Sequence, residues 1–156
     1  MLSLFNKTDF APAERVSWEV LSQQLESVRG YSALQVALAR FEGAVMLLND
    51  HSQIVFINDN CLQTLGITDP ALVYGCRPGE VLDCAHAVTA INGCGTSDDC
   101  RNCGVIHAFF ASQGGETMQK ECSILILDSP EPLNLTVRTV PYNIGESHYV
   151  IVSMTQ

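Results

Sequence analysis

The chain has 156 residues, which is long enough for one domain with its own hydrophobic core and too short for two of ordinary size. Its formal net charge of −9, with no basic stripe along the sequence, argues against nucleic acid and anionic membranes as partners. No apolar run reaches transmembrane length, and the first residues lack the basic-then-apolar layout of a signal peptide, so we expect a cytoplasmic protein.

The first predicted element is an amphipathic helix that ends an N-terminal segment, residues 1–30. Pro12 suits its first turn, Gly30 suits its end, and five apolar residues recur between them at helical spacing: Val16, Val20, Leu21, Leu25 and Val28. Two interpretations stay open, because this stripe can pack on its own domain or meet a second copy. Acidic and basic residues are equal in number within residues 1–41, so the net charge of −9 lies on residues 42–156. Since a neutral helix meets its copy without repulsion, the sequence predicts a homodimer through this helix.

The hydrophobic period then changes from that of a helix to that of a strand. Ser32 can cap a second helix, and two apolar segments, 44–49 and 54–58, predict a β-hairpin. A short helix over 61–65 ends at Gly66. A longer helix over about 101–112 and three strands follow, the strands over about 117–127, 133–142 and 149–154. This order predicts an α+β fold, a five-stranded antiparallel sheet with helices on one face, preceded by the N-terminal helix.

Four cysteines lie within twenty residues, spaced C-x9-C-x5-C-x2-C: Cys84, Cys94, Cys100 and Cys103. Glycines flank Cys94 and follow Cys103, so the backbone can curl around a shared centre. We expect Cys100 and Cys103 to project from one helical face at i, i+3. Several soft ligands presented in this way are typical of a site for one metal ion or cluster.

Three occupants of the four-cysteine site remain open. Structural zinc sites often carry two C-x2-C pairs, and only Cys100 and Cys103 form one here. Iron–sulfur clusters tolerate one close pair with distant thiols, and a disulfide switch needs no metal. The odd total of seven cysteines and the expected cytoplasmic location favour metal or redox use over a disulfide framework. The spacing favours an iron–sulfur cluster over zinc, and zinc over metal-free redox chemistry.

The charges beside the four cysteines also favour a bound metal. Asp83, Asp98 and Asp99 lie next to the thiols in sequence, and carboxylates raise thiol pKa values. Unmetallated Cys84 or Cys100 would therefore be a poor nucleophile, whereas a bound cation offsets the nearby negative charge.

Other candidate ligands are fewer and weaker. Cys76, His86 and His107 form a second tier of possible metal ligands, whereas Cys61 and Cys122 are predicted to be core thiols. The sequence carries no Ser-His-Asp order, phosphate-binding loop or paired-carboxylate arrangement, so we predict a regulatory domain and not an enzyme.

The order of elements resembles that of a PAS domain over residues 31–156. The opening AVMLLNDHSQIVFINDNCLQTLGI is similar to the hairpin and short helix that begin PAS domains. The stretch GCRPGEVLDCAHA…GCGTSDDCRNCGVIHAFFASQ resembles a cysteine-rich subgroup of PAS sensor domains from bacterial signalling proteins. In PAS domains this region usually holds a cofactor, such as haem, flavin or an iron–sulfur cluster. The resemblance implies sensing, in a domain over 31–156 with a cysteine-rich loop over 76–104.

The leading hypothesis is a redox-, oxygen- or metal-responsive PAS sensor. It would hold an iron–sulfur cluster on Cys84, Cys94, Cys100 and Cys103 and signal to a histidine kinase or other output domain. The alternative is a dimerisation or docking module whose long loop is stapled by zinc or disulfides, without redox chemistry.

Overall fold

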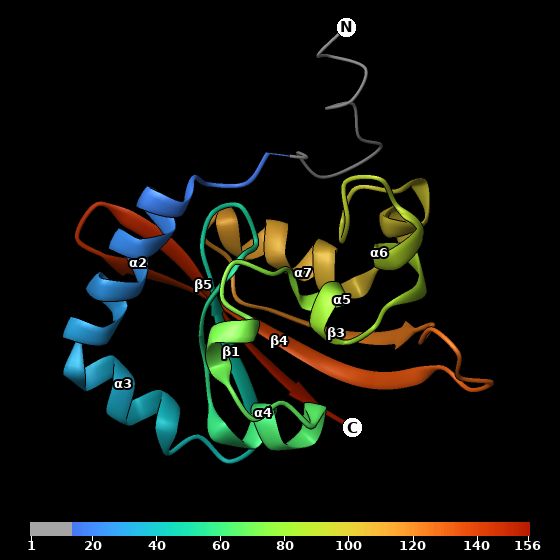
Figure 1. Ribbon diagram of the computed structural model, residues 1–156, viewed down its shortest axis with the longest axis horizontal. Helices are drawn as coiled ribbons and strands as arrows, with labels where there is room; N and C mark the ends of the chain where they lie inside the picture. The colour runs from blue at the N-terminus through green and yellow to red at the C-terminus, as the bar shows by residue number, and fades with distance from the viewer. Residues whose placement is uncertain (1–13) are drawn as a thin grey trace, which may run out of the picture.

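A five-stranded antiparallel sheet organises the computed structural model, which describes residues 14–156 (Figure 1). The strands lie in the order β2-β1-β5-β4-β3 and have the bounds β1 Ala44–Leu48, β2 Ile54–Ile57, β3 Met118–Ile124, β4 Leu133–Ile144 and β5 Ser147–Thr155. Every neighbouring pair is antiparallel. The α+β fold and the five strands were predicted from the sequence, and the structure confirms them.

Side chains alternate across the sheet, so each face carries its own apolar cluster. In β1, Met46 and Leu48 belong to one cluster, while Val45 and Leu47 belong to the other, and all four are fully buried. This central strand therefore has helices on both faces.

The helices between β2 and β3 cover one face of the sheet. Their bounds are α4 Asp59–Leu65, the 3-10 helix η1 Pro70–Leu72, α5 Pro78–Val81, α6 Ala85–Thr89, the 3-10 helix η2 Asp98–Asn102 and α7 Gly104–Gln113. The longest of them, α7, buries Val105 and Phe109 in the same cluster as Met46 and Leu48. Asn58 caps α4 through its side chain, and Gly66 ends that helix at φ 70°, as its sequence predicted.

Helices α2 (Trp18–Gly30) and α3 (Ser32–Ala39) pack on the opposite face, on the left in Figure 1. The predicted stripe of α2 is used inside the domain: Leu21, Leu25 and Val28 are 5%, 7% and 1% exposed. They meet β1, β2 and Tyr149 of β5, so these three side chains cannot form a contact with a second copy. Of the two interpretations of the stripe, packing on the same domain is the one observed.

Three predicted boundaries move for local reasons. Helix α2 begins at Trp18, because Ser17 caps it: the Ser17 side chain accepts a hydrogen bond from the Val20 amide. Pro12, the predicted first turn, lies outside the described residues. The predicted strand over 117–127 ends at Ile124, and beyond it Ile126 makes only an isolated bridge with Cys84. The helix predicted over 101–112 begins at Gly104, because the 3-10 turn η2 precedes it and Cys103 is extended.

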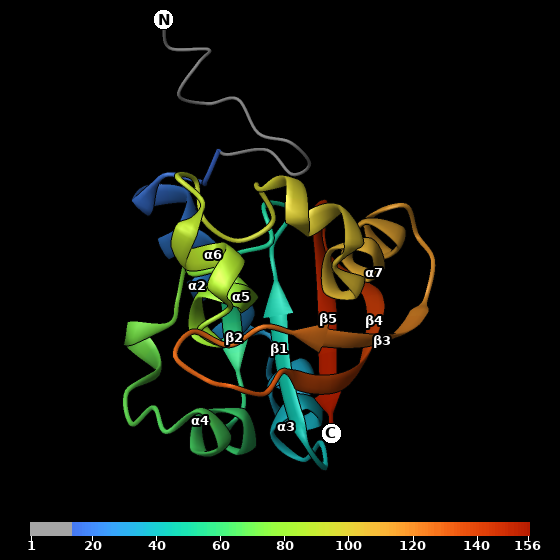
Figure 2. The ribbon, with the colours of Figure 1, turned by 90° about the vertical axis from the view of Figure 1, so that its right-hand side faces the viewer.

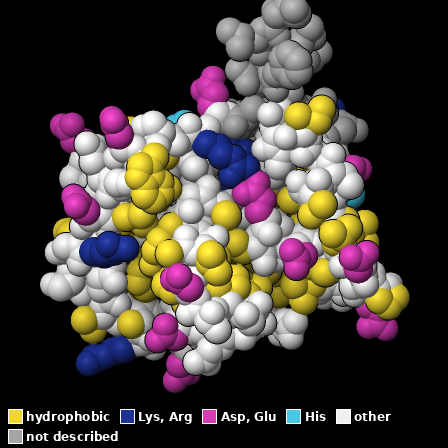
Figure 3. Space-filling view, in the orientation of Figure 1, with side chains coloured by type: hydrophobic (Ala, Val, Ile, Leu, Met, Phe, Trp, Pro, Cys, Tyr) yellow, Lys and Arg dark blue, Asp and Glu magenta, His cyan; other side chains and the backbone are white. Residues whose placement is uncertain are grey.

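The surface is predominantly acidic, in line with the net charge. Acidic side chains are spread over the face shown in Figure 3, where Lys and Arg side chains gather in only a few places. Within residues 14–156, no helix combines the length and the apolar character needed to cross a membrane.

Candidate functional site

The four clustered cysteines line one cavity of about 600 Å³. The chain from α5 to α7 forms an arch over one end of the sheet, above β3 (Figure 2). Residues of this arch and of β3 line the cavity. Cys84 precedes α6, Cys94 lies in a turn, Cys100 lies in η2 and Cys103 precedes α7. Four separate short elements thus bring together thiols that the sequence spaces irregularly.

All seven cysteines of the chain are free thiols, and those of the site differ in exposure. Cys94 and Cys100 are buried, at 9% and 6% exposed, whereas Cys84 and Cys103 are half-buried.

Gly79 fixes the position of the Cys94 sulfur. The Gly79 amide donates a hydrogen bond to Cys94 Sγ at 3.2 Å. A Cβ on residue 79 would lie 2.8 Å from that sulfur, so only glycine leaves the space that the sulfur fills. The turn that carries Cys94 is bounded by Gly93 and Gly95, both at φ 86°, a conformation that side chains other than glycine rarely adopt.

Burial is the main influence on the thiols of the site. Burial raises the pKa of Cys94 to about 12, against the opposing hydrogen bond from the Gly79 amide. Burial also raises the pKa of Cys103, while the amides of Val105 and Ile106 at the start of α7 act against it. Without a metal these two thiols are neutral at pH 7 and weak nucleophiles. Burial thus makes Cys94 and Cys103 weak nucleophiles. The sequence prediction concerned Cys84 and Cys100, and its cause was the neighbouring aspartates.

The second-tier candidates divide between the cavity and its surroundings. His86 and His107 line the cavity, whereas Cys76 does not. His86 Nδ1 lies 3.2 Å from Asp99 Oδ2, which joins α6 to η2 across the arch. His107 Nε2 contacts the carbonyl oxygen of Arg101, so this ring already has a partner within the protein.

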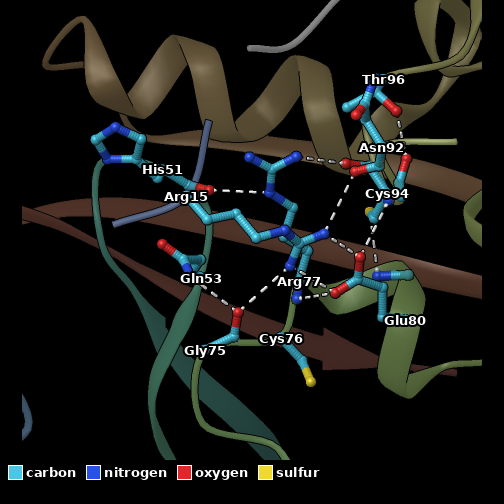
Figure 4. Close-up of polar contacts among 12 residues, drawn as sticks. Arg15, His51, Gln53, Gly75, Cys76, Arg77, Glu80, Asn92, Cys94 and Thr96 are labelled. Atoms are coloured by element: carbon cyan, nitrogen blue, oxygen red, sulfur yellow. Dashed lines mark hydrogen bonds and ion pairs between the residues drawn. The ribbon is translucent and has the colours of Figure 1, made fainter. Parts of the chain in front are cut away.

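Arg77 holds the cysteine-rich loop through hydrogen bonds of its side chain (Figure 4). Its side chain is among the largest that are fully buried, at 2% exposed. The guanidinium donates to three backbone carbonyls: His51 at 3.1 Å, Cys94 at 3.2 Å and Glu14 at 3.1 Å. One buried cation therefore joins the turn between β1 and β2, the Cys94 turn and the segment that leads into α2.

A second link runs parallel to the first, through Glu80 on α5. Its carboxylate accepts from the Arg77 amide at 2.9 Å, from the Cys94 amide at 3.4 Å and from Arg15 Nη1 at 2.9 Å. Arg15 also reaches the carbonyl oxygens of Gly75 and Asn92, each at 3.4 Å. Arg15 and Glu80 thus tie the segment that precedes α2 to α5 and to the Cys94 turn.

Among the side chains that the structure describes, no three His, Cys, Asp or Glu residues are arranged to hold a single metal ion. A tetrahedral zinc site would need each ligand sulfur at about 2.3 Å from the metal. The cavity that the four thiols line has a volume of about 600 Å³.

Two residues of the site were not predicted from the sequence. Cys122 was classed as a core thiol, and it is buried as predicted, but it also lines the cysteine cavity. Arg77 was not singled out, because arginine is ordinarily exposed. Its neighbour Glu80, three residues further on, was an available signal: its side chain accepts from the Arg77 amide in the pattern of a capping box.

Comparison with known proteins identifies the fold. The sequence matches no protein-family model and no curated protein. Solved structures of PAS domains share the architecture. The PAS domain of BvgS from Bordetella pertussis has a TM-score of 0.57 at 14% identity, over 82% of this chain and 86% of that one. The PAS domain of the nitrogen regulation protein NR(II) from Vibrio parahaemolyticus has a TM-score of 0.53 at 14% identity, over 78% of this chain and 94% of that one.

A fungal LOV domain photoreceptor is similar to the same extent. Its TM-score is 0.54 at 13% identity, over 83% of this chain and 92% of that one. The chain therefore has the PAS fold, as its sequence predicted. Sequence identities this low show the fold alone, so the assignment to the cysteine-rich subgroup stays a prediction.

Proposed function

We propose that this PAS-fold domain is a sensor that holds an iron–sulfur cluster on Cys84, Cys94, Cys100 and Cys103. The observation that carries the proposal is that these four thiols line one cavity of about 600 Å³. Thiolates are the usual ligands of iron–sulfur clusters, and clusters are larger than a single zinc ion. A cavity of this volume lined by four thiols therefore suits a cluster better than it suits one ion.

The surroundings of the thiols support a cluster that responds to redox conditions. The Gly79 amide donates to Cys94 Sγ, and hydrogen bonds to ligand sulfurs raise the reduction potential of a cluster. Cys84 and Cys103 are only half-buried, so small oxidants can reach one side of the site. When bound, the cluster would supply the redox chemistry, and the protein would supply thiolates, amide donors and partial access.

The route of the signal is proposed from the two links around Arg77 and Glu80. Both side chains contact the backbone of Cys94 and also the segment that precedes α2, through Glu14 and Arg15. Oxidation or loss of the cluster would release the Cys94 turn, and these contacts would pass the change to α2. The domain would act on a histidine kinase or another output domain and would have no catalytic activity of its own.

We also propose that the sensor is a homodimer through the N-terminal helices. The stripe first considered is buried, but Trp18 and Val20 on α2 are 72% and 41% exposed, and Val36 on α3 is 48% exposed. Residues 1–41 carry no net charge, so this is the part of the chain that meets a second copy with least repulsion.

A second function is favoured by one feature of the loop. Between Cys84 and Cys103 the regular structure consists of the five-residue α6 and the five-residue η2. Zinc or disulfides would staple such a segment and contribute folding energy directly, in a docking module without redox chemistry. The two functions differ in the metal that they need.

Purification without oxygen, followed by absorbance spectra and iron and sulfide assays, tests the proposal. We expect brown protein with charge-transfer absorbance and stoichiometric iron and sulfide. The variants Cys94→Ser and Cys100→Ser should lose both elements. Cys76→Ser is the matched control, because this thiol belongs to the same loop but lies outside the cavity. Colourless protein that holds only zinc would support the docking module and overturn the sensor.

A further inference from the structure

We propose that Cys122 is a fifth thiol ligand of this site and can replace Cys84 as the fourth ligand of the bound group. The inference rests on the proposed function, because it concerns how the same cluster is held. It assigns a ligand to the sheet, whereas the other four belong to the arch.

Cys122 belongs to the cavity by position. It lies on β3, is 7% exposed and lines the same cavity as the other four thiols. Its side chain points to the same face as Ile124, which is buried beneath the helices. Cys103 lines the same cavity from the start of α7.

Gly104 leaves the space in which the Cys122 sulfur sits. A Cβ on residue 104 would lie 2.5 Å from Cys122 Sγ and 3.3 Å from the carbonyl oxygen of Glu121. Since Gly104 directly follows Cys103, the sulfur from the sheet lies against the backbone that carries a ligand. Gly79 likewise leaves space for the Cys94 sulfur, so two sulfurs of the cavity each occupy space that a glycine leaves free.

The sulfur of Cys122 makes only a weak polar contact within the protein, with Sγ 3.9 Å from the carbonyl oxygen of Lys120. A bond to iron would therefore replace no strong hydrogen bond. The side chain would keep its buried position on the sheet.

Cys84 and Cys122 line the same cavity from two different segments, Cys84 from the arch and Cys122 from the sheet. Cys84 bridges to Ile126, four residues beyond Cys122, which is about 13 Å along an extended chain. In the proposal Cys94, Cys100 and Cys103 are the shared ligands, and either Cys84 or Cys122 supplies the fourth.

Replacement of Cys84 by Cys122 would need no oxidant, because the incoming thiol would lose one proton and the outgoing thiolate would gain one. Cys122 would then connect the bound group to β3, whereas Cys84 connects it to the arch.

The test compares iron and sulfide per chain in four proteins purified without oxygen: Cys84→Ser, Cys122→Val, the double variant, and Cys84→Ser with Cys61→Val. Cys61→Val is the matched control, because Cys61 is a buried thiol that does not line this cavity. We expect both single variants and the control to keep a cluster. The Cys84→Ser/Cys122→Val protein should lose it.

Loss of the cluster in Cys84→Ser alone, or its retention in the double variant, would overturn the inference while leaving the proposed function standing. Wild-type protein without iron and sulfide would overturn both. X-ray absorption on Cys84→Ser covers the case of a double variant that does not fold. Sulfur as the fourth protein ligand supports Cys122, and the serine oxygen in that place contradicts it.

Discussion

Gly79 is the residue on which the position of Cys94 depends most directly. A methyl group at residue 79 would meet Cys94 Sγ at 2.8 Å and Ala87 Cβ at 3.3 Å. Gly79→Ala should therefore displace the sulfur and abolish stoichiometric iron binding. Gly30→Ala is the matched control, since a Cβ there meets nothing within 4 Å. Equal iron content in the two variants would show that the Cys94 sulfur is not a ligand.

Glu80 makes the stability of the domain depend on pH. Burial acts to raise the pKa of this carboxyl, but hydrogen bonds from Arg15 and from the Arg77 amide outweigh it and hold the pKa below its usual value. The contribution of Glu80 is thus complete above the unfolded-state pKa of about 4.3 and is lost as pH falls through the folded-state pKa.

Glu80→Gln should consequently lower the free energy of unfolding at neutral pH and leave it nearly unchanged in acid. Urea unfolding between about pH 3 and pH 7 measures this difference. Glu146→Gln, at an exposed carboxylate in the turn between β4 and β5, serves as the control. A Glu80→Gln effect that stays constant over this range would contradict the ion pair.

Helix α2 stabilises the domain through its buried side. Leu25 is 7% exposed against the sheet, whereas Val20 on the same helix is 41% exposed. Leu25→Ala should lower the free energy of unfolding by about 2 to 5 kcal/mol. Val20→Ala should change it by less than about 0.5 kcal/mol. Similar values for the two variants would mean that α2 does not pack as described.

Helix α2 should also respond to the site through Arg77. Hydrogen exchange at residues 18–21 is expected to quicken when the cluster is removed, because the Cys94 carbonyl and the Glu14 carbonyl share the Arg77 guanidinium. Arg77→Met should abolish this response. Arg29→Met, at an exposed arginine on the same helix, should retain it. A wild-type α2 that exchanges equally with and without the cluster would rule out the relay.

The elements with a clear hydrophobic period, or with a glycine that ends a helix, were predictable from the sequence. The hairpin of β1 and β2 and the end of α4 at Gly66 depend on neighbouring residues alone. The clustering of Cys84 with Cys94, Cys100 and Cys103 in one cavity was also expected, since all four lie on a single loop.

Long-range contacts explain what the sequence did not predict. The alternation in β3 indicates that Cys122 faces inwards, but which helix start it meets depends on how α7 packs. Arg77 can be buried because its guanidinium donates hydrogen bonds to carbonyl oxygens of three distant segments. No local sequence pattern predicts these long-range hydrogen bonds. The stripe of α2 indicated an apolar partner but not whether that partner was the sheet or a second chain.

At the scale of the whole molecule, the exposed apolar residues of α2 are expected to join two copies. Trp18→Glu combined with Val20→Glu should give a folded monomer that keeps its metal, measured by light scattering. Leu72→Glu is the control, because Leu72 is equally exposed, at 71%, but lies on η1. A mass that stays dimeric in the double variant would place the contact elsewhere.

Native mass spectrometry of protein purified without oxygen tests whether the four-thiol cavity holds an iron–sulfur cluster. Each chain should carry iron together with inorganic sulfide, and Cys94→Ser should remove both. Chains that carry zinc alone, or no metal at all, would contradict the proposed cluster.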